Sequence, residues 1–330
     1  MKIGIFCVAD HYPRELSRDL SRFYDELLEQ VVAAEDLGFS SFWIAEHHFH
    51  EYGAIPRPPI FLSAAARLTS RIRLGSAVVV LPFDNPLRTA EDFAMVDILS
   101  GGRLCLGVGS GYLEHEYEGF GVEPSSKRER FDESLDILRL AWSGKRFSYH
   151  GRYHKIDHVR LNVRPLQEPH PPVSIAILSD QAAPFVAAKG YGLMMIPYAT
   201  TERVEELSAA VAAYRACFGE DRTGTSEEAG APAVRFALHA YCDDRGLEPG
   251  LAALERYVRT RLYARQRSFE ELDSRNLLAF GDPEKLSLIL DLYEGLGADE
   301  LLLIVNFGGL GHRDVLASMS RIAACRKVMI

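Results

Sequence analysis

Residues 42–49 read Phe42-Trp43-Ile44-Ala45-Glu46-His47-His48-Phe49, a short apolar run that ends in one carboxylate and two imidazoles. The run follows Leu37-Gly38, where helical apolar spacing stops at a glycine, so residues 42–45 are predicted to form a strand. Ionisable groups at the carboxyl end of such a strand lie where parallel α/β proteins build their sites. Because imidazole titrates near neutral pH, this stretch is a candidate site, although strand-end histidines also serve purely structural roles.

Strand and helix patterns alternate outward from this stretch in both directions. The expected strands are residues 3–8, 42–45, 72–81, 104–109, 173–178, 193–196, 234–241 and 300–305. Helical spacing is expected over residues 23–37, 60–68, 86–99, 128–142, 202–218, 251–262, 283–296 and 314–328, with a further helix that ends at Ala188. Eight strands with right-handed crossovers predict an α/β fold, a (β/α)₈ TIM barrel with insertions that forms a single domain over residues 1–330.

Three segments interrupt the alternation. Residues 147–154 are typical of a hairpin, and the polar, glycine-rich residues 219–232 are expected to form a mobile surface loop. Residues 264–279 carry many charges and few apolar side chains. This last segment is interpreted as a solvated connection, with an active-site lid as the alternative.

The bulk composition excludes several classes of protein. The 330 residues are 47% hydrophobic and carry 37 Lys and Arg against 46 Asp and Glu, a net charge of −9, which gives no support for binding to nucleic acid or anionic membranes. The five cysteines show no CxxC spacing, so neither a disulfide framework nor a zinc site is indicated. The apolar start stops at Asp10-His11 and no run approaches a membrane span of about 18 residues, so a soluble, cytoplasmic protein is expected.

Taken in this order, the motifs of the chain resemble those of the bacterial luciferase-like, flavin-dependent monooxygenases. The resemblance runs almost end to end, and it rests on the Glu46-His47-His48-Phe49 signature and on residues 74–82, 85–92, 99–104, 107–112, 281–284 and 306–310. Each motif alone is weak, whereas their order together is specific.

The resemblance implies a chemistry and a set of partners. The barrel would bind reduced FMN, supplied by a separate flavin reductase, and would use O₂ through a C4a-(hydro)peroxyflavin to oxygenate a small organic substrate, an aldehyde, a ketone or an electron-rich ring. His47 matches the family's catalytic histidine, with Glu46 or His48 holding its tautomer. A non-proline cis peptide under the flavin ring matches Ala77-Val78. Family members pair through helices near residues 60–68 and 90–99, so a homodimer is expected.

The resemblance also implies where the flavin phosphate binds. The matching positions are Gly109, Ser110, Gly111 and Tyr112 after the fourth strand, then Leu178 and Ser179 after the fifth. Backbone N–H groups in a glycine-rich turn and at a helix start suit a phosphate dianion. The luciferases place arginine at the position of Ser110 and cysteine at that of Gly109. Other groups are therefore expected to contribute to phosphate binding here. Oxygenation without light emission is expected.

Three other interpretations were weighed. The Gly107-x-Gly109-x-Gly111 pattern fails as a dinucleotide fingerprint, because Tyr112 stands where the third glycine belongs. A metal-dependent barrel hydrolase would use His48 and His50 on one strand face, but no second ligand cluster completes such a site, and no metal is expected. A non-catalytic flavin-binding or partner subunit of the same fold is the remaining alternative, against which the retained Glu46-His47-His48 argues.

Overall fold

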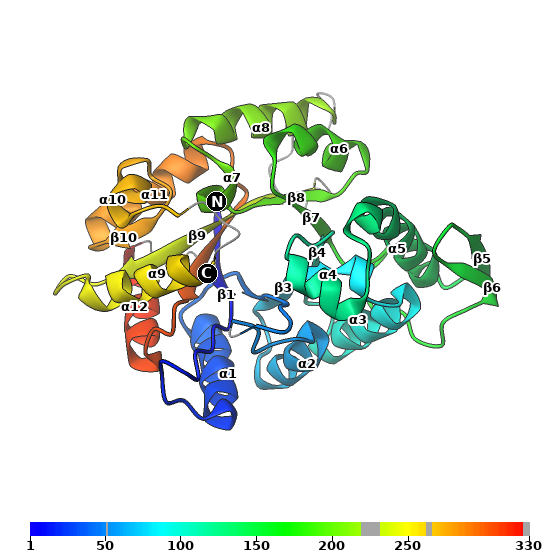
Figure 1. Ribbon diagram of the computed structural model, residues 1–330, viewed down its shortest axis with the longest axis horizontal. Coiled ribbons are helices and arrows are strands. Elements are labelled where there is room, and N and C mark those ends of the chain that lie inside the picture. Colours follow the sequence, from blue (N-terminus) through cyan, green and yellow to red (C-terminus); the bar gives the residue numbers. More distant parts are fainter. Residues whose placement is uncertain (51, 219–231, 262–265, 326–330) are drawn as a thin grey trace.

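Eight parallel strands close into a barrel in the computed structural model, which describes residues 1–50, 52–218, 232–261 and 266–325 (Figure 1). In order around the barrel they are β1 (Lys2–Cys7), β2 (Ser41–Ile44), β3 (Arg73–Val80), β4 (Leu104–Gly109), β7 (Val173–Ile177), β8 (Gly192–Met195), β9 (Val234–Cys242) and β11 (Glu300–Asn306). Each pairs in parallel with the next, and β11 pairs with β1 to close the ring. The predicted fold and its eight strands are confirmed.

Helices surround the barrel on its outside (Figure 1). They are α1 (Leu20–Asp36), α2 (Pro58–Leu68), α3 (Pro86–Ser100), α4 (Glu114–Phe120), α5 (Lys127–Trp142), α6 (Ala183–Ala188), α7 (Pro197–Thr200), α8 (Glu205–Ala216), α9 (Glu248–Thr260), α10 (Phe269–Ser274), α11 (Pro283–Gly295) and α12 (His312–Cys325). Helix α3 shows why the sequence places such elements: the Asn85 side chain accepts the Leu87 N–H, Pro86 is its first residue, and Gly101 ends it in the left-handed region.

The strands are buried on both faces, because helices cover them outside and side chains fill the barrel inside. Every residue of β2, β4, β9 and β11 is buried, as expected for a parallel sheet between two layers. Charged residues are included in this burial: the Arg235 guanidinium meets the Glu300 carboxylate at 2.7 Å near the amino ends of β9 and β11. The amino end of the barrel is therefore filled by packed side chains.

The segment over residues 264–279 differs from the preferred prediction. Helix α10 lies within it, and the short strand β10 (Ala279–Gly281), which begins at its end, pairs with β9. Leu272, Leu277 and Leu278 are fully buried, and the buried Arg267 donates a hydrogen bond to the Thr201 carbonyl at 2.8 Å. The interpretation as a solvated connection is wrong over residues 266–279, because its few apolar side chains all face the core; residues 264 and 265 lie outside the described part, and the lid alternative stays a prediction.

Two other segments bear on the predictions. Strands β5 (Phe147–His150) and β6 (Lys155–Val159) form the predicted hairpin, which projects beside α5 (Figure 1). Nearly all of the loop predicted at residues 219–232 lies outside the described residues. In the described part of the chain, no helix is long and apolar enough to cross a membrane.

Candidate functional site

A cavity of about 640 Å³ lies at the carboxyl ends of the barrel strands. Its size is that of a pocket for a cofactor or a small molecule, and its position is where barrel enzymes place their sites. The predicted site residues that line it are Glu46, His47, Ala77, Val78, Gly109, Ser110, Gly111, Tyr112, Leu178 and Ser179. The fold thus brings together residues that are up to 133 positions apart in the sequence, and His48 alone among the predicted residues does not line the cavity.

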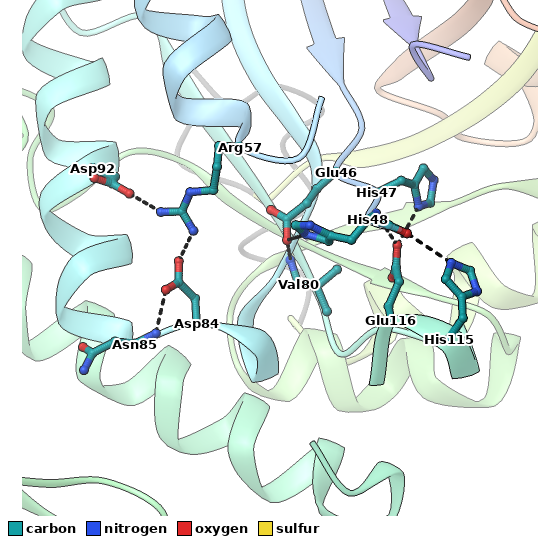
Figure 2. Close-up of polar contacts among 10 residues, drawn as sticks. All are labelled: Glu46, His47, His48, Arg57, Val80, Asp84, Asn85, Asp92, His115 and Glu116. Atoms are coloured by element: carbon teal, nitrogen blue, oxygen red, sulfur yellow. Dashed lines mark hydrogen bonds and ion pairs between the residues drawn. The ribbon is translucent and has the colours of Figure 1, made fainter. Parts of the chain in front are cut away.

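His47 is paired with a carboxylate that the sequence did not single out. Its Nδ1 lies 3.3 Å from Glu116 Oε1, and the same oxygen accepts the His48 backbone N–H at 2.9 Å (Figure 2). Glu116 comes from the short helix α4 and its side chain is only 2% exposed. The Tyr52 ring meets the His47 ring edge-on, 5.2 Å between centroids. One carboxylate therefore fixes both the ring and the backbone of the loop that carries His47.

Glu46 and His48 form a second pair, behind the first. His48 Nε2 lies 3.2 Å from Glu46 Oε1, which also faces the Val80 N–H at 3.4 Å (Figure 2). Burial raises the pKa of Glu46, against the opposing hydrogen bond from His48. The expectation that Glu46 or His48 holds the tautomer of His47 is wrong: Glu46 is engaged with His48, and Glu116 faces His47.

The structure also removes the basis of a metal pair at His48 and His50. Strand β2 ends at Ile44, so the two histidines lie in the following loop instead of on one strand face. His48 contacts Glu46, and the His50 ring lies on the Tyr52 ring, with centroids 4.0 Å apart. Among the described residues, no group of three His, Cys, Asp or Glu side chains is arranged to hold a metal ion.

The floor of the cavity is formed where β3 and β4 meet. The peptide bond between Ala77 and Val78 is cis, in agreement with the resemblance, and the pairing of β3 with β4 shifts register there. A Cβ on Gly109 would lie 2.7 Å from Val78 Cγ2, and Gly111 has a positive φ of 80°. Both positions therefore require glycine, the first for close packing and the second for its backbone conformation.

One end of the cavity is polar and carries positive charge. The loop at Ser110–Tyr112 and residues Leu178 and Ser179 line it, together with Lys127 and Arg128 from the first turn of α5. The Arg128 guanidinium lies 4.4 Å from the centroid of the Phe185 ring. Cations are disfavoured at a helix N-terminus by the helix dipole, so two of them beside a cavity make this part of the lining the candidate position for an anion.

The sequence reasoning missed Lys127, Arg128 and Glu116. The two cations stand at the start of a helix that was predicted to begin at Arg128, so a basic pair at a helix start was the available signal. Glu116 follows the glycine-rich turn by five residues, but α4 was not predicted, because its seven residues are too short for a periodic pattern.

The other end of the cavity is apolar and aromatic. Phe6, Met194, Tyr198, Ala237 and Tyr257 line it. Phe61 and Phe83 do not line it: Phe61 is buried in the core, and Phe83 packs against Tyr117 with ring centroids 4.8 Å apart. The site thus joins a basic group of side chains, a carboxylate–histidine pair and a group of aromatic side chains.

A parallel eight-stranded barrel with a cavity at its carboxyl end defines the α/β class of TIM-barrel proteins. The profile of the family described as "Luciferase-like monooxygenase" matches residues 1–300. The chain therefore belongs to the luciferase-like monooxygenase family.

Similar proteins differ in the reactions that their names state. The monooxygenase RslO1 from Streptomyces bottropensis has a similar structure, with a TM-score of 0.88, 28% identity and 98% of each chain covered. The oxygenase component of the flavin-dependent trigonelline monooxygenase from Acinetobacter baylyi is 30% identical over 56% of this chain and 52% of its own length. An F420-dependent glucose-6-phosphate dehydrogenase from Amycolatopsis mediterranei is 32% identical over 51% of this chain and 52% of its own. The chain spans about half the length of the curated relatives it matches.

Proposed function

We propose that this chain is the oxygenase component of a flavin-dependent monooxygenase, which takes FMN reduced by a separate flavin reductase and uses O₂ to oxygenate a small organic substrate. The observation that carries the proposal is that His47, Ala77-Val78 and the turn at 109–112 line one cavity whose far end holds two cations. The similarity to a flavin-dependent oxygenase component supports the flavin and the reductase.

The residues present fit FMN by their chemistry. Lys127, Arg128 and the N–H groups of the glycine-rich turn suit a phosphate dianion, and they take the place of the arginine that the luciferases carry at Ser110. The packed floor at Ala77-Val78 and the apolar wall suit a flat ring system. Bound FMN would supply the activation of oxygen, and the protein supplies position, charge and exclusion of water.

The side chains have distinct tasks in this proposal. His47 faces the cavity and moves a proton at its Nε2, while Nδ1 stays directed at Glu116. Glu116 holds the ring, and Glu46 with His48 keeps the loop behind it in place. The aromatic end admits substrate and excludes water from the site.

The phosphate assignment is tested with Arg128→Met. Loss of one charge-assisted contact is expected to weaken FMN binding by about tenfold to a hundredfold and to leave riboflavin, which lacks the phosphate, unaffected. Flavin fluorescence titrations of both ligands measure this. Arg139→Met, on the same helix with a side chain 63% exposed, is the matched control, and equal FMN affinity in all three proteins would remove Arg128 from the site.

Catalysis itself is tested by mixing the protein with photoreduced FMN and aerated buffer in a stopped-flow spectrometer. A transient absorption band that belongs to neither reduced nor oxidised FMN is the expected result. Direct reoxidation at full flavin occupancy would instead assign the chain to a non-catalytic flavin-binding subunit. Absence of flavin binding would overturn both.

A second candidate is an F420-dependent dehydrogenase, because one relative of similar identity carries that name. Parallel titrations with FMN and F420 distinguish the two. Preference for reduced FMN, with oxygen consumption, supports the monooxygenase. Preference for F420, with hydride transfer from an alcohol and no oxygen consumption, supports the dehydrogenase.

A homodimer through α2 and α3 also belongs to the proposal. These two helices pack together and leave large apolar side chains exposed, among them Ile60 at 72%, Leu68 at 55% and Met95 at 51%. Exposed apolar side chains gathered on adjacent helices are typical of a protein–protein interface. Light scattering at working concentration is expected to give twice the mass of one chain, and a monomer would remove this part of the proposal.

A further inference from the structure

His239 is a buried histidine that the proposed chemistry does not use. It lies on β9 with an exposed fraction of 1%, and neither of its ring nitrogens has a hydrogen-bond partner among the described residues. Buried polar groups in native proteins are nearly always paired, and one left unpaired costs roughly 1–3 kcal/mol. An unpaired imidazole in the core therefore calls for a functional reason.

The position of His239 places it beside the aromatic end of the cavity. Side chains two apart on a strand share a face, and Ala237, two residues earlier on β9, lines the cavity. The rings of Tyr198 and Tyr257, which also line it, meet the His239 ring edge-on, with centroids 5.1 and 4.3 Å away. His239 itself does not line the cavity, and the Phe307 ring also packs against its ring, with centroids 5.1 Å apart. The imidazole thus lies directly behind two cavity-lining tyrosines.

The surroundings of His239 also fix its charge. Burial, with a smaller contribution from the Arg261 guanidinium, lowers its pKa to about 3, so the ring is neutral and offers one N–H donor and one nitrogen acceptor. Arg261 is itself engaged: it forms an ion pair with Asp10 and is stacked between the rings of Tyr52 and Tyr257, at 3.9 and 4.1 Å. This end of the site therefore offers hydrogen bonds and aromatic faces, without a free cation among these neighbours for a carboxylate.

We propose that His239 is a specificity-determining residue, whose imidazole hydrogen-bonds a neutral hydroxyl or carbonyl group of a ring-bearing substrate that packs against the rings of Tyr198 and Tyr257. This inference rests on the proposed function and names its substrate class: an uncharged ring compound with one polar substituent. The unpaired nitrogens are the groups that such a substituent satisfies on binding. The destabilisation they cause in the free protein is offset when the substrate binds, and it makes the site discriminate against plain hydrocarbons.

His239→Phe tests this, because phenylalanine keeps the aromatic packing and removes both nitrogens. Four probes are titrated by calorimetry: phenol, acetophenone, toluene and benzoate. The unmodified protein is expected to bind phenol or acetophenone about three- to tenfold more tightly than toluene, the ratio of one hydrogen bond, and to bind benzoate more weakly than acetophenone. The variant is expected to bind phenol, acetophenone and toluene alike and to have a Tm higher by about 2 °C, since it buries no unpaired nitrogen.

His170→Phe is the matched control. This histidine also lies against aromatic rings, but its Nδ1 is 2.8 Å from the Pro171 carbonyl oxygen, at the amino end of β7. The control is expected to keep the probe preference and to show no rise in Tm. Retention of the preference in His239→Phe, or equal or undetectable binding of all probes to the unmodified protein, would overturn the inference.

The titrations are run with and without FMN, so two failures can be told apart. Lack of FMN binding counts against the proposed function, while the probe preference of the chain alone still decides the role of His239. FMN binding without any probe preference counts against His239 alone.

Discussion

The two ends of the barrel differ in how completely their buried polar side chains are paired. At the amino end, Glu300 accepts bonds from Arg235 Nε at 2.7 Å and from Ser40 Oγ at 2.9 Å, and Arg235 also donates to Ser174 Oγ at 2.7 Å. None of these four side chains has a buried polar atom without a partner among the described residues. At the carboxyl end, neither ring nitrogen of the buried His239 has a hydrogen-bond partner among the described residues.

This difference separates polar side chains that stabilise the fold from polar side chains that can still bind a ligand. A saturated network, such as that of Arg235 and Glu300, has no capacity left for a ligand, and its removal is expected to affect folding alone. Groups such as His47, Arg128 and His239 line or adjoin the cavity and retain that capacity. Substitutions at the two ends should therefore affect different measurements.

The largest effect is expected at the carboxyl end from His47→Ala. Loss of a positioned proton-transfer group is expected to lower oxygenation by about a hundredfold to ten-thousandfold, with FMN affinity nearly unchanged, because the phosphate end is untouched. Single-turnover kinetics and flavin titration measure the two quantities. His50→Ala makes the same chemical change three residues away, outside the cavity, and should leave both unchanged; equal rates in the two variants would remove His47 from the mechanism.

At the amino end, Arg235→Met is expected to leave Glu300 buried without its cation. The free energy of unfolding should fall by about 3–5 kcal/mol, while the folded protein binds FMN as before. Urea unfolding followed by tryptophan fluorescence measures the first quantity. Arg152→Met breaks an ion pair whose arginine side chain is 71% exposed, and its loss should stay below about 1 kcal/mol. A strong effect of Arg235→Met on flavin affinity would contradict the separation of the two ends.

A smaller effect is expected from Glu116→Gln, which keeps an oxygen for the His48 N–H and removes the charge that faces His47. Oxygenation should fall on the order of tenfold, equivalent to about 1.4 kcal/mol of transition-state stabilisation. Glu118→Gln on the same helix, with an exposed side chain, should show the full rate. An unchanged rate in Glu116→Gln would mean that the His47 ring is held by packing against Tyr52 alone.

The smallest effect is expected in the pH dependence of stability, and it concerns the pair formed by Glu46 and His48. Burial raises the pKa of Glu46 above its ordinary value of 4.5, so the folded state binds the proton more tightly than the unfolded state does. As pH rises above that ordinary value, ionisation of buried Glu46 therefore withdraws stability from the folded protein. Glu46→Gln cannot ionise, so its Tm relative to the unmodified protein should increase as the pH rises above 4.5. Exposed Glu91→Gln should show no such trend, and a trend of opposite sign at Glu46 would refute the shift.

The sequence sufficed for the barrel, which follows from local signals, and for part of the cavity lining, which follows mainly from the family resemblance. Buried strands are apolar runs, and the turn at 109–112 is rich in glycine. The pairing of His47 with Glu116 was beyond reach, since it joins residues 69 apart in the chain through a helix too short to show a period. His239 was missed for a different reason: the sequence of an apolar strand does not show whether a polar side chain in it will have a hydrogen-bond partner in the fold.

Helix α4 links two parts of the site. The turn at 109–112 leads directly into it, and the Tyr117 hydroxyl donates a hydrogen bond to the Ser110 carbonyl from the same turn of helix that presents Glu116 to His47. The cavity turn and the carboxylate that faces His47 are therefore joined by one short helix, so a substitution that displaces the turn is expected to displace Glu116 as well.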